Sequence, residues 1–144
     1  MTIKQSNWAK GIEVTTTSDY SGEVVCERFT FTVTDNLTSA DIIELGVLPA
    51  GSTVVDAILN TGNLGAGVTV TSGIMSGVVG DKDAARTCGS ELFAAVANNA
   101  IVRPSTSSAF TIAPVNADRS LGVKVSGNVT AANQVVALSV FYKQ

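Results

Sequence analysis

Hydrophobic and polar side chains alternate along several short stretches of the chain, and this alternation limits the fold more than any other feature. Between residues 24 and 34, Val25, Phe29, Phe31 and Val33 fall on one side, while cysteine, arginine and threonine fall on the other. A period of two residues, carried by β-branched and aromatic side chains, is typical of a strand with one buried face. The sequence therefore predicts a strand over residues 24–34.

The stretch DIIELGVLPAGSTVVDAILNTG predicts two more strands, over residues 42–47 and 52–60, on either side of Leu48-Pro49-Ala50-Gly51. Proline at the second position of a turn presets φ at about −65°, and glycine at the fourth position suits a type I turn. We expect these two strands to fold back on each other as a hairpin.

The C-terminal part of the chain has the longest pattern of this kind. Shorter strands are predicted over residues 68–71 and 121–126, and a long one over residues 134–142. Because the last segment is apolar on both faces, it is expected in the interior of a sheet or beneath a partner.

The middle of the chain gives weaker signals. Residues 81–89 and 103–108 are polar and are expected to form loops, and residues 110–113 form a short predicted strand that ends at Pro114. The segment SELFAAVA, residues 90–97, is compatible with a short helix or with a strand.

About eight short strands, spaced roughly a dozen residues apart, predict an all-β fold. An antiparallel β-sandwich of jelly-roll type, or a related barrel, fits this spacing. With 144 residues the chain is long enough for one ordinary domain. We divide it into a short polar N-terminal arm, residues 1–10, and a single β-sandwich domain, residues 11–144.

Charge and hydropathy exclude several functions. Charged residues make up 15% of the chain, against roughly 25% in an average globular protein. The lysines and arginines are scattered and the net charge is −3, which disfavours nucleic acid as a partner. No stretch approaches the ~18 apolar residues of a membrane helix. The N-terminus has no apolar core of signal-peptide length, so the chain is expected to fold where it is made.

No catalytic or metal-binding motif is found. The chain has no histidine, which removes the common nucleophilic triads and the commonest metal ligand. Residues 81–83, Asp-Lys-Asp, begin like a calcium loop, but Arg86 and Leu92 stand where glycine and glutamate are needed. The glycine-rich residues 62–67 lack the lysine of a phosphate-binding loop and are expected to form a turn. Cys26 and Cys88 lack zinc spacing and are expected to be free, half-buried thiols.

Carboxylates also give no convincing catalytic pair. Asp41 and Glu44 are three residues apart on a strand, so their side chains should point to opposite faces. Asp56 lies among apolar neighbours and is expected to face solvent or to pair with a lysine or arginine. We therefore predict a protein that is not an enzyme and that needs no cofactor or metal.

The sparse charge predicts instead that much of the surface is covered by other protein. At 14.7 kDa the folded chain should expose roughly 6,900 Å². Such a surface favours a homo-oligomer or a larger assembly. Amphipathic and apolar side chains in the arm, at an isolated tyrosine and at the C-terminal strand are the candidates for the interface: Ile3, Trp8, Tyr20, Phe141 and Tyr142.

Two parts of the sequence resemble small virion proteins of tailed bacteriophages. Residues 41–74 match their strand, L-P-A-G, strand pattern, and residues 120–142 match their later strands, which end in an apolar and aromatic tail. The resemblance implies a head decoration, or cement, protein with a jelly-roll-like fold. Such a protein is made in the host cytoplasm, binds the outside of the capsid and clamps neighbouring major capsid subunits. On this reading we expect the homo-oligomer to be a dimer or trimer, and the arm, residues 1–10, to reach a neighbour.

Other functions remain open from sequence alone. A tail, fibre or connector subunit on the same sandwich is the nearest alternative, and copy number in the particle distinguishes it from a cement protein. A carbohydrate-binding β-sandwich is a further alternative, but it needs exposed aromatic rings, and this chain has only one tryptophan and two tyrosines.

Overall fold

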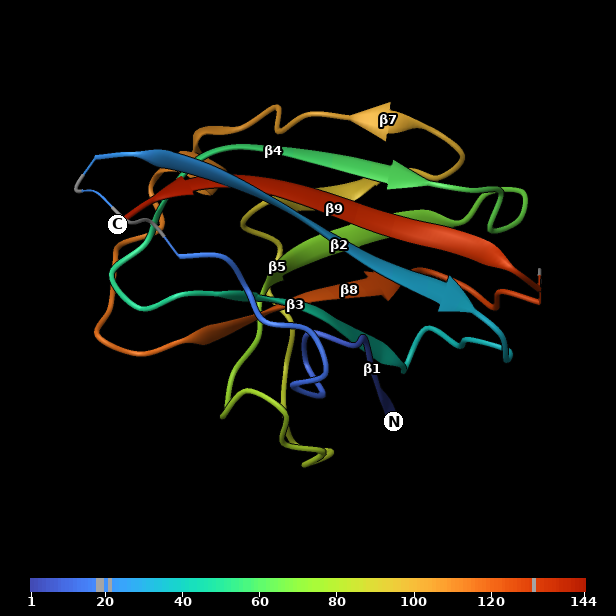
Figure 1. Cartoon of the computed structure of the whole chain (residues 1–144). Coiled ribbons are helices and arrows are strands. Elements are labelled where there is room, and N and C mark those ends of the chain that lie inside the picture. The colour runs from blue at the N-terminus through green and yellow to red at the C-terminus, as the bar shows by residue number, and fades with distance from the viewer. Residues whose placement is uncertain (18–19, 21, 131) are drawn as a thin grey trace.

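The computed structural model describes residues 1–17, 20, 22–130 and 132–144. Nine strands in the described residues form two sheets that pack face to face (Figure 1). The five-stranded sheet has the order β1 (Ile3–Gln5), β3 (Ile42–Leu48), β8 (Arg119–Val125), β5 (Thr69–Ile74) and β6 (Phe93–Ala97). The four-stranded sheet has the order β2 (Val24–Val33), β9 (Gln134–Lys143), β4 (Thr53–Thr61) and β7 (Ile101–Val102). The predicted all-β sandwich is confirmed.

The order of the strands is that of a jelly roll. From β2 to β9 the chain changes sheet at every step except from β5 to β6. All pairs among these eight strands are antiparallel, whereas the added strand β1 pairs in parallel with β3. Eight strands in two sheets, connected across the sandwich, are characteristic of this architecture.

The predicted hairpin between residues 42–47 and 52–60 is wrong. Both segments are strands, but β3 pairs with β8 in one sheet and β4 pairs with β9 in the other. The connection is an arch between sheets, closed by a hydrogen bond from the Ser52 N–H to the Pro49 carbonyl (3.2 Å). Gly51 is therefore the third residue of the turn, and its φ of +76° suits the glycine position of a type II turn.

The C-terminal strand lies where its two apolar faces predict. β9 has β2 on one side and β4 on the other, so it is an interior strand of its sheet. Val136, Leu138, Val140 and Tyr142 point into the sandwich and are fully buried. Leu45 and Leu121 from the opposite sheet belong to the same apolar core, and burying side chains of this size contributes ~1.5–3 kcal/mol each.

A second, smaller apolar cluster lies on the outer side of the five-stranded sheet. Along β3, Ile42 and Glu44 alternate with the core residues Ile43 and Leu45, so they point away from the sandwich. They are nevertheless buried, because residues 75–92, here named the covering loop, pack over them. Its residues Met75 and Cys88 form this cluster with Ile3 and Ile42.

Other local predictions need correction. Residues 110–113 are not a strand: a short 3₁₀ helix, Ser107–Phe110, ends at Phe110, and residues 111–113 have no regular secondary structure. Within residues 90–97, where helix and strand were both open, Phe93–Ala97 forms β6. The short strands β1 and β7 have no counterpart among the predicted ones. Among the described residues no helix has the length and hydropathy to cross a bilayer.

The N-terminal segment, predicted as a polar arm, packs against its own chain. Strand β1 pairs Ile3 with Ile42, and Ile3 and Ala9 are buried. The Trp8 ring meets the Phe29 ring edge-on, with centroids 5.5 Å apart. Residues 3–9 are thus part of the fold of this chain. A role of this segment in reaching a neighbour remains a prediction.

Candidate interaction surfaces

The outer face of the four-stranded sheet is the broadest surface built by the strands. Every second residue of β2, β9 and β4 points outward, and the register places them in rows across the sheet. One row contains Cys26, Phe141 and Asp56. The next row contains Ser139, with Arg28 beside it on β2 and Ile58 on β4. We call this surface the outer sheet face.

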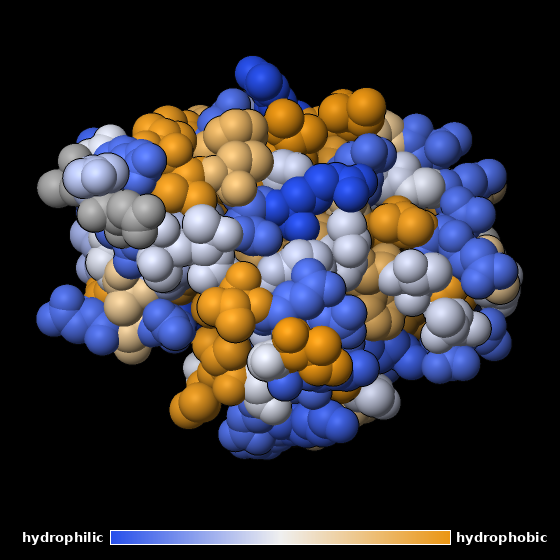
Figure 2. All heavy atoms as spheres, viewed as in Figure 1, coloured by the Kyte–Doolittle hydropathy of each residue, from blue (hydrophilic) through white to orange (hydrophobic). Residues whose placement is uncertain are grey.

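Few charges lie on the outer sheet face. Its largest exposed apolar side chains are those of Val24, Val55, Val135 and Ile101, which are 39–74% exposed. Figure 2 shows hydrophobic groups along the upper part of this face, over β9 and β4, with hydrophilic groups interspersed among them. A face of this kind is a candidate for contact with another protein.

The charges that are present on this face include one weak ion pair. Arg103 Nη1 lies 3.6 Å from Asp56 Oδ2, and their side chains are 69% and 30% exposed. The prediction that Asp56 faces solvent or pairs with a lysine or arginine is therefore confirmed. Exposed pairs of this kind contribute little to stability.

A second apolar surface lies beside the N-terminal segment. Trp8, Val14, Val47, Pro49 and Val79 are among the residues that line a groove of about 340 Å³. Val14 on its rim is 86% exposed. We call this surface the N-terminal groove. It brings four segments distant in sequence together around the half-buried tryptophan.

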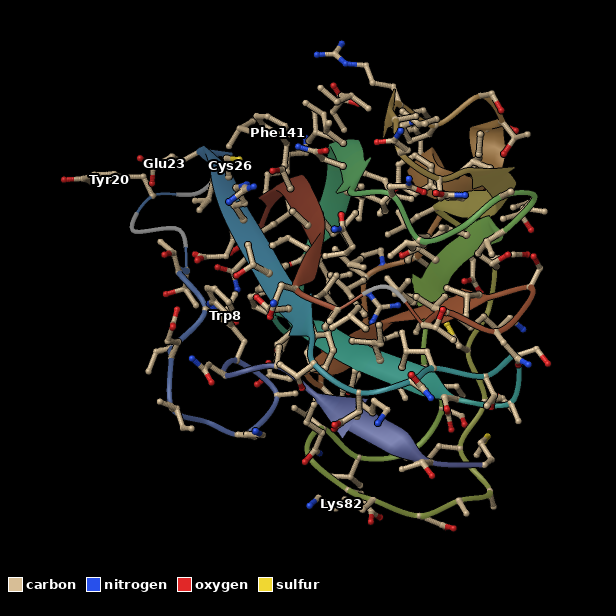
Figure 3. All side chains as sticks on the ribbon, turned by 90° about the vertical axis from the view of Figure 1, so that its right-hand side faces the viewer. Trp8, Tyr20, Glu23, Cys26, Lys82 and Phe141 are labelled. Atoms are coloured by element: carbon tan, nitrogen blue, oxygen red, sulfur yellow. The ribbon has the colours of Figure 1, made fainter. Side chains whose placement is uncertain are left out.

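The five predicted interface residues do not form one site. Figure 3 shows Tyr20 projecting from the molecule and Phe141 near the end of the sheet, with Trp8 between the N-terminal segment and β2. Tyr20 is 76% exposed, and Trp8 and Phe141 are half-buried. Ile3 and Tyr142 are buried within their own chain, so we do not build the interface on them.

Tyr142 instead has an internal role. Its hydroxyl donates a hydrogen bond to the Thr16 carbonyl, which ties the segment before β2 to the sandwich. Burial raises the pKa of Tyr142 to about 12, and the nearby Glu27 carboxylate adds to this. The phenol therefore stays protonated and remains a donor at neutral pH.

A buried ion pair, which sequence reasoning missed, holds the covering loop on its sheet. Glu44 Oε1 accepts hydrogen bonds from Arg86 Nη2 (3.0 Å), Ser120 Oγ (2.5 Å) and the Gly80 N–H (2.9 Å). Its other oxygen accepts from Gln5 Nε2 (2.8 Å). Four donors from three separate segments, β1, the covering loop and β8, meet on one carboxylate with no exposed surface.

This cluster is structural in character. Burial alone would raise the pKa of Glu44, but the hydrogen bonds from Arg86, Ser120 and their neighbours outweigh it and hold the pKa below its ordinary value. The carboxylate is thus ionised, and each of its oxygens accepts at least one hydrogen bond. Among the described residues, no group of three potential ligands is placed to hold a metal ion.

A chain in the solved structure "Capsid of Ralstonia phage GP4" is similar to this one over its whole length. The two share 45% sequence identity with a TM-score of 0.93, over 99% of this chain and 97% of the other. The chain belongs to a family of bacteriophage capsid proteins. It is therefore a structural protein related to phage capsids, as its sequence predicted.

Two more distant phage structures share the fold of this capsid protein. A chain of the cyanophage Pam1 capsid asymmetric unit matches with 16% identity and a TM-score of 0.65, over 91% of each chain. A chain of the acid-stable capsid of Helicobacter pylori bacteriophage KHP30 matches with 16% identity and a TM-score of 0.57, over 87% of this chain and 90% of the other. No protein-family model and no curated protein matches the sequence.

Proposed function

We propose that this capsid protein is a cement protein, which binds the outside of a phage shell and links neighbouring major capsid subunits. The observation that carries this proposal is the 45% identity, over nearly the full length of both chains, to a chain of the Ralstonia phage GP4 capsid. The chain folds as one small sandwich with a surface of 6795 Å². That size suits a subunit that sits on a shell.

The outer sheet face is the surface we assign to the shell. A ten-residue strand is about 33 Å long, and the three long strands β2, β9 and β4, spaced ~4.8 Å apart, span roughly 14 Å. The product, on the order of 500 Å², is more than half of the ~800 Å² that each partner contributes to a stable interface. Its low charge keeps the cost of removing water from this face small.

The opposite end of the molecule has the character of a solvent-facing surface. Asp81, Lys82 and Asp83, at the tip of the covering loop, are all exposed. Figure 3 places Lys82 at the far end of the molecule from Phe141. A copy that lies with the outer sheet face on the shell therefore presents these charges to water.

The function that follows is mechanical. Each copy that bridges two shell subunits adds buried area that must be broken before the subunits separate. Selective binding to the assembled shell stabilises that state by mass action. The proposed partners are the major capsid protein and other copies of this chain, as a dimer or trimer. Sedimentation of the purified protein measures that oligomeric state.

Removal and restoration of the protein test the proposal. Particles stripped of this chain by mild denaturant should keep closed shells that rupture at lower temperature, and added protein should restore the original rupture temperature. Stripping that dissolves the shell would show that the chain forms the shell itself. Its detection at a few copies per particle would favour a tail, fibre or connector role.

A matched pair of substitutions tests the assigned surface. Val135, on the outer sheet face, and Val115, beside the arch at the end of the sandwich, are both 39% exposed. Val135→Glu should weaken binding to stripped shells about tenfold or more, because it buries a charge in the interface. Val115→Glu should leave binding unchanged. Equal loss in both variants would contradict the assignment.

A further inference from the structure

Strand β2 forms one edge of the four-stranded sheet along its full length. Its ten residues pair with β9 from Val24 opposite Lys143 to Val33 opposite Gln134, without a shift in register. Among the described residues, no strand lies on its other side. Figure 1 shows β2 as a long arrow at the margin of this sheet.

The register fixes which backbone groups of β2 point away from β9. The Gly62 N–H donates to the Val135 carbonyl (2.9 Å). The backbone N–H and C=O groups of the odd-numbered residues of β9 therefore point toward β4, and those of the even-numbered residues point toward β2. The residues of β2 opposite those even-numbered ones therefore bond to β9. The backbone N–H and C=O groups of the alternate residues point away from β9, in the plane of the sheet: Val24, Cys26, Arg28, Thr30 and Thr32.

These outward groups have no hydrogen-bond partner within the part of the chain that the structure describes. Proteins usually protect such an edge with proline, a bulge, inward-pointing charges or a very short strand. The sequence of β2, VVCERFTFTV, has no proline, and its register has no bulge. Its one inward-pointing charge, Glu27, lies in the first half of the strand, so residues 28–33 of the edge have none of these protections. The other edge strands, β1, β6 and β7, have five residues or fewer. An edge of this length and composition is suited to pairing with another strand.

We propose that β2 receives an extended segment of a neighbouring shell subunit, which adds a fifth strand to the four-stranded sheet. This inference rests on the proposed cement function, which supplies the shell subunit as the partner. Main-chain hydrogen bonds along β2 would then fasten the protein to the shell beside the contact of the outer sheet face.

The inner side of this edge favours a single segment over a second copy of the chain. Residues 5–17 already run along it, since Trp8 packs on Phe29 and the Thr16 N–H donates to Glu27 Oε2 (3.2 Å). A second copy that paired through its own β2 would bring its residues 5–17 to the same place. A single strand with no layer beneath it avoids this overlap.

The side chains near the edge define the chemistry of the segment. Arg28 is exposed on the outer side. On the inner side, a polar cavity of about 260 Å³ separates residues 5–10 from residues 30–32, and Lys10 lines it. Arg28 and Lys10 outnumber the one carboxylate of β2, Glu27, which accepts a hydrogen bond from Thr16, so the edge favours a segment with acidic or polar side chains at the facing positions.

A proline substitution tests the pairing. The Thr30 N–H points away from β9, so Thr30→Pro removes no bond within the sheet but places a ring where the added strand must lie. We expect this variant to stay folded and to bind stripped shells about tenfold or more weakly than the wild type. The control, Thr30→Val, keeps the N–H and should bind within about threefold of the wild type. Equal binding by the proline and valine variants would overturn the proposal.

Hydrogen exchange on the wild-type protein gives a second readout that does not depend on the fold of a variant. The amides of Cys26, Arg28, Thr30 and Thr32 should exchange fast in the isolated protein and slowly on the shell. Fast exchange in the bound state would overturn the inference while leaving the cement function intact. Slow exchange in the concentrated isolated protein would identify a second copy as the occupant. Failure of the wild type to bind stripped shells would instead refute the proposed function.

Discussion

Replacement of Arg86 by methionine should strongly destabilise the fold, because it leaves the Glu44 carboxylate buried without its cation. The two side chains are 2% and 0% exposed and lie 3.0 Å apart. Breaking a buried pair by removing one partner costs ~3–5 kcal/mol. Arg86→Met also removes hydrogen bonds to the Ser76 and Asp81 carbonyls. For a chain of this length the loss corresponds to a melting temperature lower by about 10–20 °C.

Urea unfolding followed by circular dichroism measures this loss, and the chain supplies its own control. The exposed pair of Arg103 and Asp56 contributes at most ~1 kcal/mol, so Arg103→Met should be nearly neutral. The double variant Glu44→Gln, Arg86→Met should recover part of the loss, because no buried charge remains. If Arg86→Met destabilised the protein no more than Arg103→Met, the assignment of the cluster as the anchor of the covering loop would be refuted.

The same cluster predicts a pH dependence. The pKa of Glu44 is lower in the folded chain than its ordinary value of 4.5. A lowered folded pKa contributes stability that is present above the unfolded pKa and is lost as the pH falls through the folded pKa. The wild type should therefore lose stability below about pH 4.5 more steeply than Glu44→Gln. Parallel profiles for the two proteins would show that Glu44 does not act in this way.

Three further substitutions or reactions test details of the fold. Gly46→Ala should destabilise by ~1–3 kcal/mol in urea, because its Cβ would overlap an aromatic ring on β2. Tyr142→Phe should cost ~1 kcal/mol and speed proteolysis near Thr16, whose carbonyl loses its donor. A thiol reagent at pH 8 should label exposed Cys26 in the native protein and Cys88 only after unfolding, because burial raises the pKa of Cys88 to about 11.

Local patterns in the sequence predict the strands but not their partners. The alternation in β2 and the two apolar faces of β9 are properties of single segments, and both strands lie close to their predicted bounds. The pairing of β3 and β4 depends on residues far away in the chain, such as those of β8 and β9. A turn sequence such as Leu48–Gly51 serves an arch as well as a hairpin, so the sequence could not exclude the wrong pairing.

Burial of side chains outside the main core was equally hidden from the sequence. The interface prediction includes Ile3 and Tyr142 because they are apolar or amphipathic side chains in the arm and in the C-terminal strand, yet both are buried. The sequence alone places Glu44 on a strand and Arg86 in a polar loop, and it does not indicate that the two side chains meet. The one available signal was a glutamate within the apolar run IIELGVL, since charged residues in such runs are rarely buried without a partner.

The two outer faces of the sandwich differ in a way that bears on how the protein would sit on a shell. The outer side of the five-stranded sheet is covered by the covering loop, whose apolar contacts and buried ion pair would be lost if it opened. The outer sheet face has no such cover, although its central strand is apolar there at Val135, Ala137 and Phe141. The chain covers the outer side of its five-stranded sheet with its own loop but leaves the outer sheet face exposed. We infer that other subunits of the assembly cover the outer sheet face. The unpaired edge of β2 borders this same face, so sheet face and edge would meet the shell together.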